Sequence, residues 1–216
     1  MIFLISKLLT MLVLSLISRR EVVGLENIPE KGPVLLMANH SSWLDPPILG
    51  WLMPRRISFM AKEELFRNWF VRWVVVGYGA FPIRRGEGDR QALREALKVL
   101  EANGVLGMFP EGTRSRTGEL QAGQPGAALL ALKSGAPVVP VAIVGSEKIW
   151  HLSSIIHRPR FKVIVGRPFR LSQFEARGRK VLDALSDEMM LQIAGLLPPE
   201  RQGVYRGRVQ GQVVAK

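Results

Sequence analysis

Short apolar runs alternate with helix-forming segments through most of this 216-residue chain, and this alternation constrains the fold more than any other feature. Such an order is typical of βα units, in which helices cover the faces of a largely parallel sheet. The predicted strands are Val34–Ala38, Ile57–Ala61, Ala80–Arg84, Val105–Phe109, Val138–Val144 and Phe161–Val165. The sequence therefore predicts an α/β fold with a mostly parallel, mixed sheet flanked by helices.

Three segments are predicted to be helices, namely Asp89–Asn103, Gly126–Lys133 and Lys180–Ala194. The first of them has an apolar face formed by Leu93, Ala96, Leu97 and Leu100. In the first, Asp89 is suited to cap the start and Gly104 to support the stop. Residues 201–216 are basic and have no clear helical period, so we expect a mobile tail after a single domain at residues 21–200.

The N-terminal segment Met1–Ser18 is mostly apolar and ends at the pair Arg19–Arg20. No small-residue cleavage pattern follows, so we expect residues 1–20 to form a retained membrane-associated helix. About 17 helical residues reach roughly 26 Å, slightly less than the ~30 Å hydrocarbon core. The row Ser6, Thr10, Leu14 and Ser18 predicts a helix lying partly in the interface with this row toward the headgroups. Spanning the bilayer and packing within the domain are the alternatives.

A second segment, Leu65–Gly77, combines tryptophan, phenylalanine and valine with two arginines. A basic, aromatic helix of this kind suits a membrane interface, and a core-packing helix is the alternative. The pair Arg19–Arg20 favours anionic lipid, which predicts the cytoplasmic face of the cell membrane.

The balance of charge favours an anionic partner. Lysine and arginine number 30 against 18 acidic residues, a net charge of +12. The aromatic residues mostly lie in apolar runs rather than between basic residues, which argues against nucleic acid. The chain has no cysteine, and this excludes disulfides, a thiolate nucleophile and thiolate metal ligands.

The segment after the first predicted strand carries the strongest chemical signal. His40 follows this strand at the edge where α/β folds place their sites. Asp45 precedes two prolines and is suited to cap a helix, so the loop can return its carboxylate to one ring nitrogen of His40. Such a pair is a general base with the group that orients it, and a structural loop histidine is the alternative. The other histidines are distant in sequence, so no metal site is predicted.

Two further strand ends carry groups suited to phosphate. Arg84 and Arg85 end one strand, and the planar guanidinium fits a phosphate well. The stretch Pro110–Arg116 follows another and offers a hydroxyl, backbone N–H groups near Gly112 and two arginines. There are structural alternatives for both strand ends. The arginines can be solvated, and Glu111 can hold Arg114 or cap backbone groups.

Four ordered blocks resemble the glycerolipid acyltransferase family, closest to its 1-acylglycerol-3-phosphate acyltransferase branch. They are Asn39–Asp45, Gly79–Arg85, Phe109–Arg116 and Val139–Ala142. The resemblance implies that His40 and Asp45 are catalytic, and that Arg85 and Arg114 bind the glycerol phosphate. Further substrate-binding candidates are Glu111, Gly112, Thr113 and, secondarily, Lys62. The fourth block is usually assigned to the acyl side or to structure.

The resemblance also implies the reaction. An acyl group passes from acyl-CoA or acyl-carrier protein to the 2-hydroxyl of 1-acylglycerol 3-phosphate (lysophosphatidic acid), forming phosphatidic acid without a cofactor. Glycerol 3-phosphate or another lysolipid is the alternative acceptor, and a lipid esterase in which His40 activates water is the alternative class. No covalent acyl-enzyme is expected, because Ser41 and Ser42 lack the Gly-x-Ser-x-Gly elbow.

Overall fold

The computed structural model describes residues 2–77, 79–83, 90–149, 154–171 and 178–209. In these residues, seven strands form one sheet in the order β1-β7-β6-β2-β5-β3-β4. The strands are β1 (Arg19–Val23), β2 (Val34–Ala38), β3 (Ile57–Lys62), β4 (Phe81–Ile83), β5 (Val105–Met108), β6 (Val138–Val144) and β7 (Arg160–Val165). Strands β2 to β6 are parallel, β7 is antiparallel to β6, and β1 is parallel to β7. The predicted α/β fold with a mixed sheet is confirmed.

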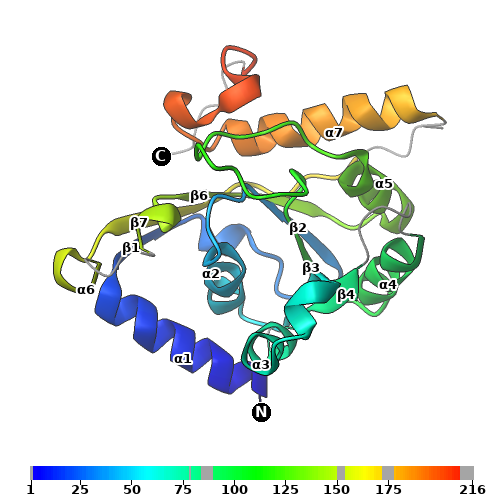
Figure 1. The fold of residues 1–216 in the computed structure, drawn as a ribbon. Helices are drawn as coiled ribbons and strands as arrows, with labels where there is room; N and C mark the ends of the chain where they lie inside the picture. The colour runs from blue at the N-terminus through cyan, green and yellow to red at the C-terminus, as the bar shows by residue number, and fades with distance from the viewer. Residues whose placement is uncertain (1, 78, 84–89, 150–153, 172–177, 210–216) are drawn as a thin grey trace.

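Helices cover both faces of the sheet (Figure 1). They are α1 (Ile2–Ile17), α2 (Asp45–Leu52), α3 (Trp69–Gly77), α4 (Arg90–Glu101), α5 (Pro125–Ser134), α6 (Ser154–His157) and α7 (Arg179–Ala194). Short 3-10 turns are η1 (Leu25–Asn27), η2 (Glu63–Phe66), η3 (Ser146–Lys148), η4 (Pro199–Arg201) and η5 (Gly203–Tyr205). Helices α1 and α2 pack on one face of the sheet, and α4, α5 and α7 pack on the other.

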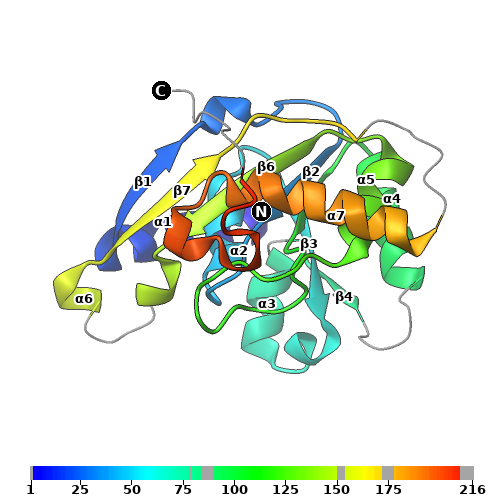
Figure 2. The same ribbon diagram turned by 90° about the horizontal axis from the view of Figure 1, so that it is seen from above.

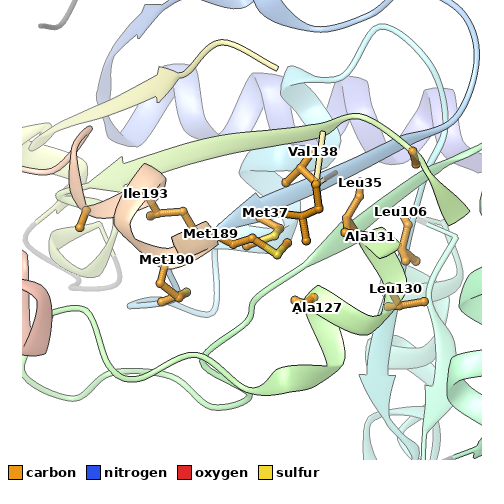
Figure 3. Close-up of a cluster of buried hydrophobic side chains, with 14 of the residues drawn as sticks. Leu35, Met37, Leu106, Ala127, Leu130, Ala131, Val138, Met189, Met190 and Ile193 are labelled. Carbon is orange, nitrogen blue, oxygen red and sulfur yellow. The ribbon is translucent and has the colours of Figure 1, made fainter. Parts of the chain in front are cut away.

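Strand β2 is buried on both faces, which explains its unbroken apolar sequence. Val34, Leu36 and Ala38 belong to the core under α1 and α2. Leu35 and Met37 point to the opposite core, where Figure 3 shows them near the side chains of α5 and α7. The central strand is thereby fixed, and with it the start of the loop that follows Ala38.

Helix α4 ends in a Schellman motif. The left-handed residue of this motif lies one position before Gly104, the residue predicted to support the stop. Asn103, rather than Gly104, has the left-handed conformation, with φ 58°. The N–H of Gly104 donates to Val99 O at 2.8 Å, and a Cβ on Gly104 would lie 2.6 Å from that oxygen. Glycine is therefore needed at 104 for space, and the predicted cap Asp89 lies outside the described residues.

Strand β1 was not predicted from the sequence, because only two of its five residues are apolar and the strand lies exposed at the sheet edge. Figure 2 shows β1 beside β7, and Arg19 pairs with Arg160. The prediction that one helix extends over residues 1–20 is wrong for residues 18–20. The helix stops at Ile17, and Arg19 and Arg20 begin a strand of the domain.

The mobile tail predicted from residue 201 is wrong for residues 201–209. Tyr205 is fully buried, and its hydroxyl donates to Asp187 at 3.0 Å. Arg201 forms an ion pair with Glu147 at 2.6 Å. Short 3-10 turns have no long apolar period, so the sequence pattern did not reveal this packing. Residues 210–216 lie outside the described residues.

Helix α1 packs on the domain with the face that was predicted to meet headgroups. Ser6, Leu14 and Ser18 are buried, and the Ser18 hydroxyl donates to Leu14 O. Small serine side chains allow the helix to approach closely, so this row faces the protein. The opposite face is apolar and exposed through Leu4, Ile5, Leu8, Leu9, Met11, Leu12, Val13 and Leu16. Within the described residues, no helix is long and apolar enough to cross a membrane.

Candidate active site

The loop between β2 and α2 brings His40 and Asp45 into contact. Asp45 Oδ2 lies 2.9 Å from His40 Nδ1, as the sequence predicted. The carboxylate is fully buried, whereas the imidazole keeps 16% of its side-chain surface exposed. Asp45 is the first residue of α2 and not its cap, and its Oδ2 instead accepts the N–H groups of Ser41 and Ser42, each at 2.7 Å.

These contacts determine which nitrogen of His40 can act as a base. A carboxylate only accepts hydrogen bonds, so the proton between the two side chains belongs to His40 Nδ1. The lone pair is then on Nε2, the nitrogen that does not contact Asp45. Phe109 stacks on the imidazole with ring centroids 4.1 Å apart and an interplanar angle of 22°. The ring is therefore held at its edge by Asp45 and on its face by Phe109.

The predicted substrate-binding residue Glu111 binds the main chain. It is 3% exposed, and its Oε1 accepts the N–H of His40 at 2.6 Å. Its Oε2 accepts the backbone and side-chain N–H groups of Gln121 at 3.0 and 3.3 Å. Burial raises the pKa of Glu111 to about 7, partly opposed by these hydrogen bonds. This geometry fits the alternative role considered from the sequence, the capping of backbone groups.

The His40 peptide is held on its other side by the same segment. Ser115 N–H donates to His40 O at 2.7 Å. Gly112 has φ 70°, and its N–H donates to Phe109 O at 3.0 Å, so this amide serves the turn. Thr113 is exposed at the end of the turn. The first and third sequence blocks therefore form one hydrogen-bonded unit.

Arg114 stacks on Trp43, a residue within the loop between His40 and Asp45. The guanidinium carbon lies 3.7 Å from the centroid of the indole, and Trp43 is 52% exposed. A guanidinium stacked by its face keeps its N–H groups, which lie in its plane, available to an anion. Trp43 was not predicted from the sequence, because a stacking partner is a tertiary contact.

Two predicted phosphate ligands are not described by the structure. Arg85 lies outside the described residues, and of Lys62 only the main chain is described. Strands β3 and β4 are parallel to β2 and β5, so they end at the same edge of the sheet as His40 and Glu111. The roles of Arg85 and Lys62 stay predictions. In the described part of the chain, no cluster of three or more His, Asp or Glu residues could hold a metal ion.

The hydroxyls of Ser41 and Ser42 both have partners, one of them outside the loop. The Ser41 hydroxyl lies 3.3 Å from that of Ser146, and the Ser42 hydroxyl accepts the N–H of Leu44 at 3.2 Å. Ser146 also donates to Asp45 Oδ1 at 2.6 Å. This residue was missed from the sequence, although it is the first polar side chain after the fourth block and β6.

Comparison with known proteins identifies the class. The family model described as Acyltransferase matches residues 19–144, more than half of the chain, and the chain belongs to this family. It is therefore an O-acyltransferase, as the four blocks predicted.

Individual relatives indicate which branch of the acyltransferase family the chain resembles. A 1-acyl-sn-glycerol-3-phosphate acyltransferase of Bacillus subtilis is 31% identical over 163 residues, which cover 75% of this chain and 79% of the relative. A relative of the same name from Borreliella burgdorferi is 32% identical over 146 residues, 67% of this chain and 58% of the relative. The crystal structure of the 1-acyl-sn-glycerophosphate acyltransferase from Thermotoga maritima superposes with a TM-score of 0.72 at 26% identity, covering 90% of this chain and 78% of that one. The resemblance predicted from the blocks is confirmed.

Proposed function

We propose that this protein transfers a fatty acyl group from a thioester to the 2-hydroxyl of 1-acylglycerol 3-phosphate, forming phosphatidic acid. The observation that carries the proposal is the 2.9 Å contact between His40 and the buried Asp45, within the segment that matches the acyltransferase family. Relatives whose names specify this reaction support the choice of acceptor.

His40 acts as the general base. Its Nε2 removes the proton of the acceptor hydroxyl while the oxygen attacks the thioester carbonyl. The tetrahedral intermediate then expels the thiolate, and the imidazolium returns the proton to the sulfur. Asp45 holds the tautomer and stabilises the imidazolium. General-base help contributes about 10²–10⁴-fold, so the orientation of the two substrates must supply much of the remaining acceleration.

Arg114 is the described residue best suited to hold the phosphate of the acceptor. Its stacking on Trp43 orients the guanidinium near His40, because Trp43 lies in the same loop as the base. Arg85 and Lys62 are further candidates on sequence grounds. The reaction needs no cofactor, and acyl-CoA or acyl-carrier protein serves as the donor. Direct transfer is favoured because the Ser41 hydroxyl contacts that of Ser146 and the Ser42 hydroxyl accepts the N–H of Leu44.

We place the protein at the cytoplasmic face of the cell membrane through the exposed face of α1. Eight large apolar side chains are exposed on this one helix, and such a contiguous patch is typical of an interaction with lipid or protein. Trp69 at the start of α3 is 80% exposed. Both the acceptor and the product are lipids, so an interfacial helix would place the site at its substrate.

A second acceptor class has one observation in its favour. A lyso-ornithine lipid O-acyltransferase of Pseudomonas aeruginosa is 38% identical over 113 residues, 51% of this chain and 43% of that relative. A lysolipid with another head group is therefore the alternative acceptor.

The test crosses two donors with three acceptors. Purified protein is given acyl-CoA or acyl-carrier protein together with 1-acylglycerol 3-phosphate, glycerol 3-phosphate or lyso-ornithine lipid, and the products are identified by mass spectrometry. We expect phosphatidic acid from the first acceptor at the highest kcat/KM. Preference for lyso-ornithine lipid would replace the proposed acceptor, and release of free fatty acid without an acylated lipid would make the protein an esterase.

A further inference from the structure

Ser146 begins η3 and follows β6 with only Gly145 between them, at the edge of the sheet that holds His40. Its side chain is fully buried, and its hydroxyl donates to Asp45 Oδ1 at 2.6 Å. A serine hydroxyl has one proton to donate, and that of Ser146 goes to the Asp45 carboxylate, which can only accept hydrogen bonds. In the 3.3 Å contact between Ser41 and Ser146, the donor is therefore Ser41. A chain of hydrogen bonds runs from Ser41 through Ser146 and Asp45 to His40.

The fold fixes Ser146 relative to His40 through the residue before each of them. Asn39 precedes His40, and its side chain donates to Ile143 O at 2.9 Å and accepts Ile143 N–H at 2.7 Å. These bonds tie the start of the catalytic loop to β6. Gly145 precedes Ser146 with φ 88°, and a Cβ there would lie 2.6 Å from the main-chain oxygen of Arg160. Glycine therefore permits the turn that aims Ser146 at Asp45.

The two oxygens of Asp45 have different partners. Oδ2 accepts from His40 Nδ1 and from the N–H groups of Ser41 and Ser42. Oδ1 accepts a hydrogen bond from the Ser146 hydroxyl. Without the Ser146 hydroxyl, one buried oxygen would lose its donor, and the carboxylate could rotate away from the imidazole.

We propose that Ser146 is a positioning residue of the acyl-transfer reaction, which fixes the Asp45 carboxylate so that it holds His40 with Nε2 free to accept a proton. The inference rests on the proposed role of His40 as general base. It gives the segment after the fourth block a role in catalysis that does not require contact with the acyl chain.

The first test is steady-state kinetics of Ser146→Ala in the full-length chain. We expect kcat to fall about 10- to 100-fold, the effect of one lost hydrogen bond to a buried charged group, with the KM for each substrate changed less than about 3-fold. The matched control is Ser186→Ala, because Ser186 on α7 is also buried and its hydroxyl donates to Gln124 O at 3.1 Å. We expect near wild-type kcat from the control.

A second variant covers the case in which Ser146→Ala does not fold. Ser146→Cys has nearly the same shape and a weaker donor, so it should fold and lose kcat in the same direction. Thermal unfolding of each variant establishes that folded proteins are compared.

A double-mutant cycle separates positioning from a structural role. If Ser146 acts through Asp45, Ser146→Ala should cost less than about 3-fold in an Asp45→Asn background, because the group that it positions is already impaired. Additive losses, or an unchanged kcat in folded Ser146→Ala, would overturn the inference. Full turnover by His40→Ala would instead overturn the proposed function, so the two failures are distinguishable.

Discussion

The buried carboxyl of Glu111 predicts a pH dependence of stability that a single substitution should remove. Glu111 accepts the N–H of His40 and two N–H groups of Gln121, and it is almost inaccessible to solvent. Glu111→Gln keeps the size and shape of the side chain but cannot ionise. The difference in unfolding free energy between the two proteins therefore isolates the cost of placing a charge at this position.

The sign follows from the raised pKa. Burial raises the pKa of Glu111 from 4.5 to about 7, so the folded protein holds its proton to higher pH than the unfolded chain. The stabilisation from this proton is fully present below pH 4.5 and is lost as pH rises through 7. A shift from 4.5 to about 7 corresponds to about 3 kcal/mol, at 1.36 kcal/mol for each pKa unit.

Urea unfolding of both proteins between pH 4.5 and pH 8 measures this effect. We expect wild type to lose about 3 kcal/mol relative to Glu111→Gln over this range, with most of the change below pH 7. The slope of unfolding free energy against urea should stay equal for the two proteins, which shows that the same transition is compared. Parallel stability curves would refute the reasoning, because they would mean that Glu111 is ionised at the same pH in the folded and unfolded chains.

Two further predictions concern the acceptor substrate and the membrane. Trp43→Ala should raise the KM for lysophosphatidic acid about 2- to 5-fold and change the KM for the donor little, because an exposed cation–π contact such as that with Arg114 contributes about 0.5–1 kcal/mol. Trp43→Phe should raise this KM less, and equal effects on both substrates would contradict the role of Trp43. Replacing Leu8 and Leu12 by glutamate should release the protein from anionic vesicles in a flotation assay without lowering its melting temperature, because both side chains are exposed. Unchanged flotation would exclude the α1 face as the membrane contact.

Local patterns predicted the central part of the fold because the central strands are buried on both faces. Val34–Ala38 and Val138–Val144 are continuous apolar runs, and the structure has both with the predicted bounds. Edge strand β1 was missed because an exposed strand needs few apolar residues. The 3-10 turns around Tyr205 were missed because one buried side chain anchors them without a periodic pattern.

The candidate site shows the same division between local and tertiary signals. The contact between His40 and Asp45 was predictable, because only a short loop between β2 and α2 separates His40 from Asp45, the first residue of α2. Ser146 lies 101 residues from Asp45, and only the pairing of β2 with β6 brings them together. The orientation of α1 was predicted wrongly because serine was assumed to face water, whereas Ser18, just after the helix, donates its hydroxyl to Leu14 O in the last turn and packs on the domain.

The most direct test of the account is the turnover of His40→Ala with 1-acylglycerol 3-phosphate and an acyl thioester. Asn39 and Glu111 hold the main chain of this loop, so the variant should keep the wild-type melting temperature. Loss of the general base should lower kcat by about 10²–10⁴-fold with the KM for each substrate nearly unchanged. A folded His40→Ala that retains more than about a tenth of wild-type kcat would contradict the central claim that His40 activates the acceptor hydroxyl.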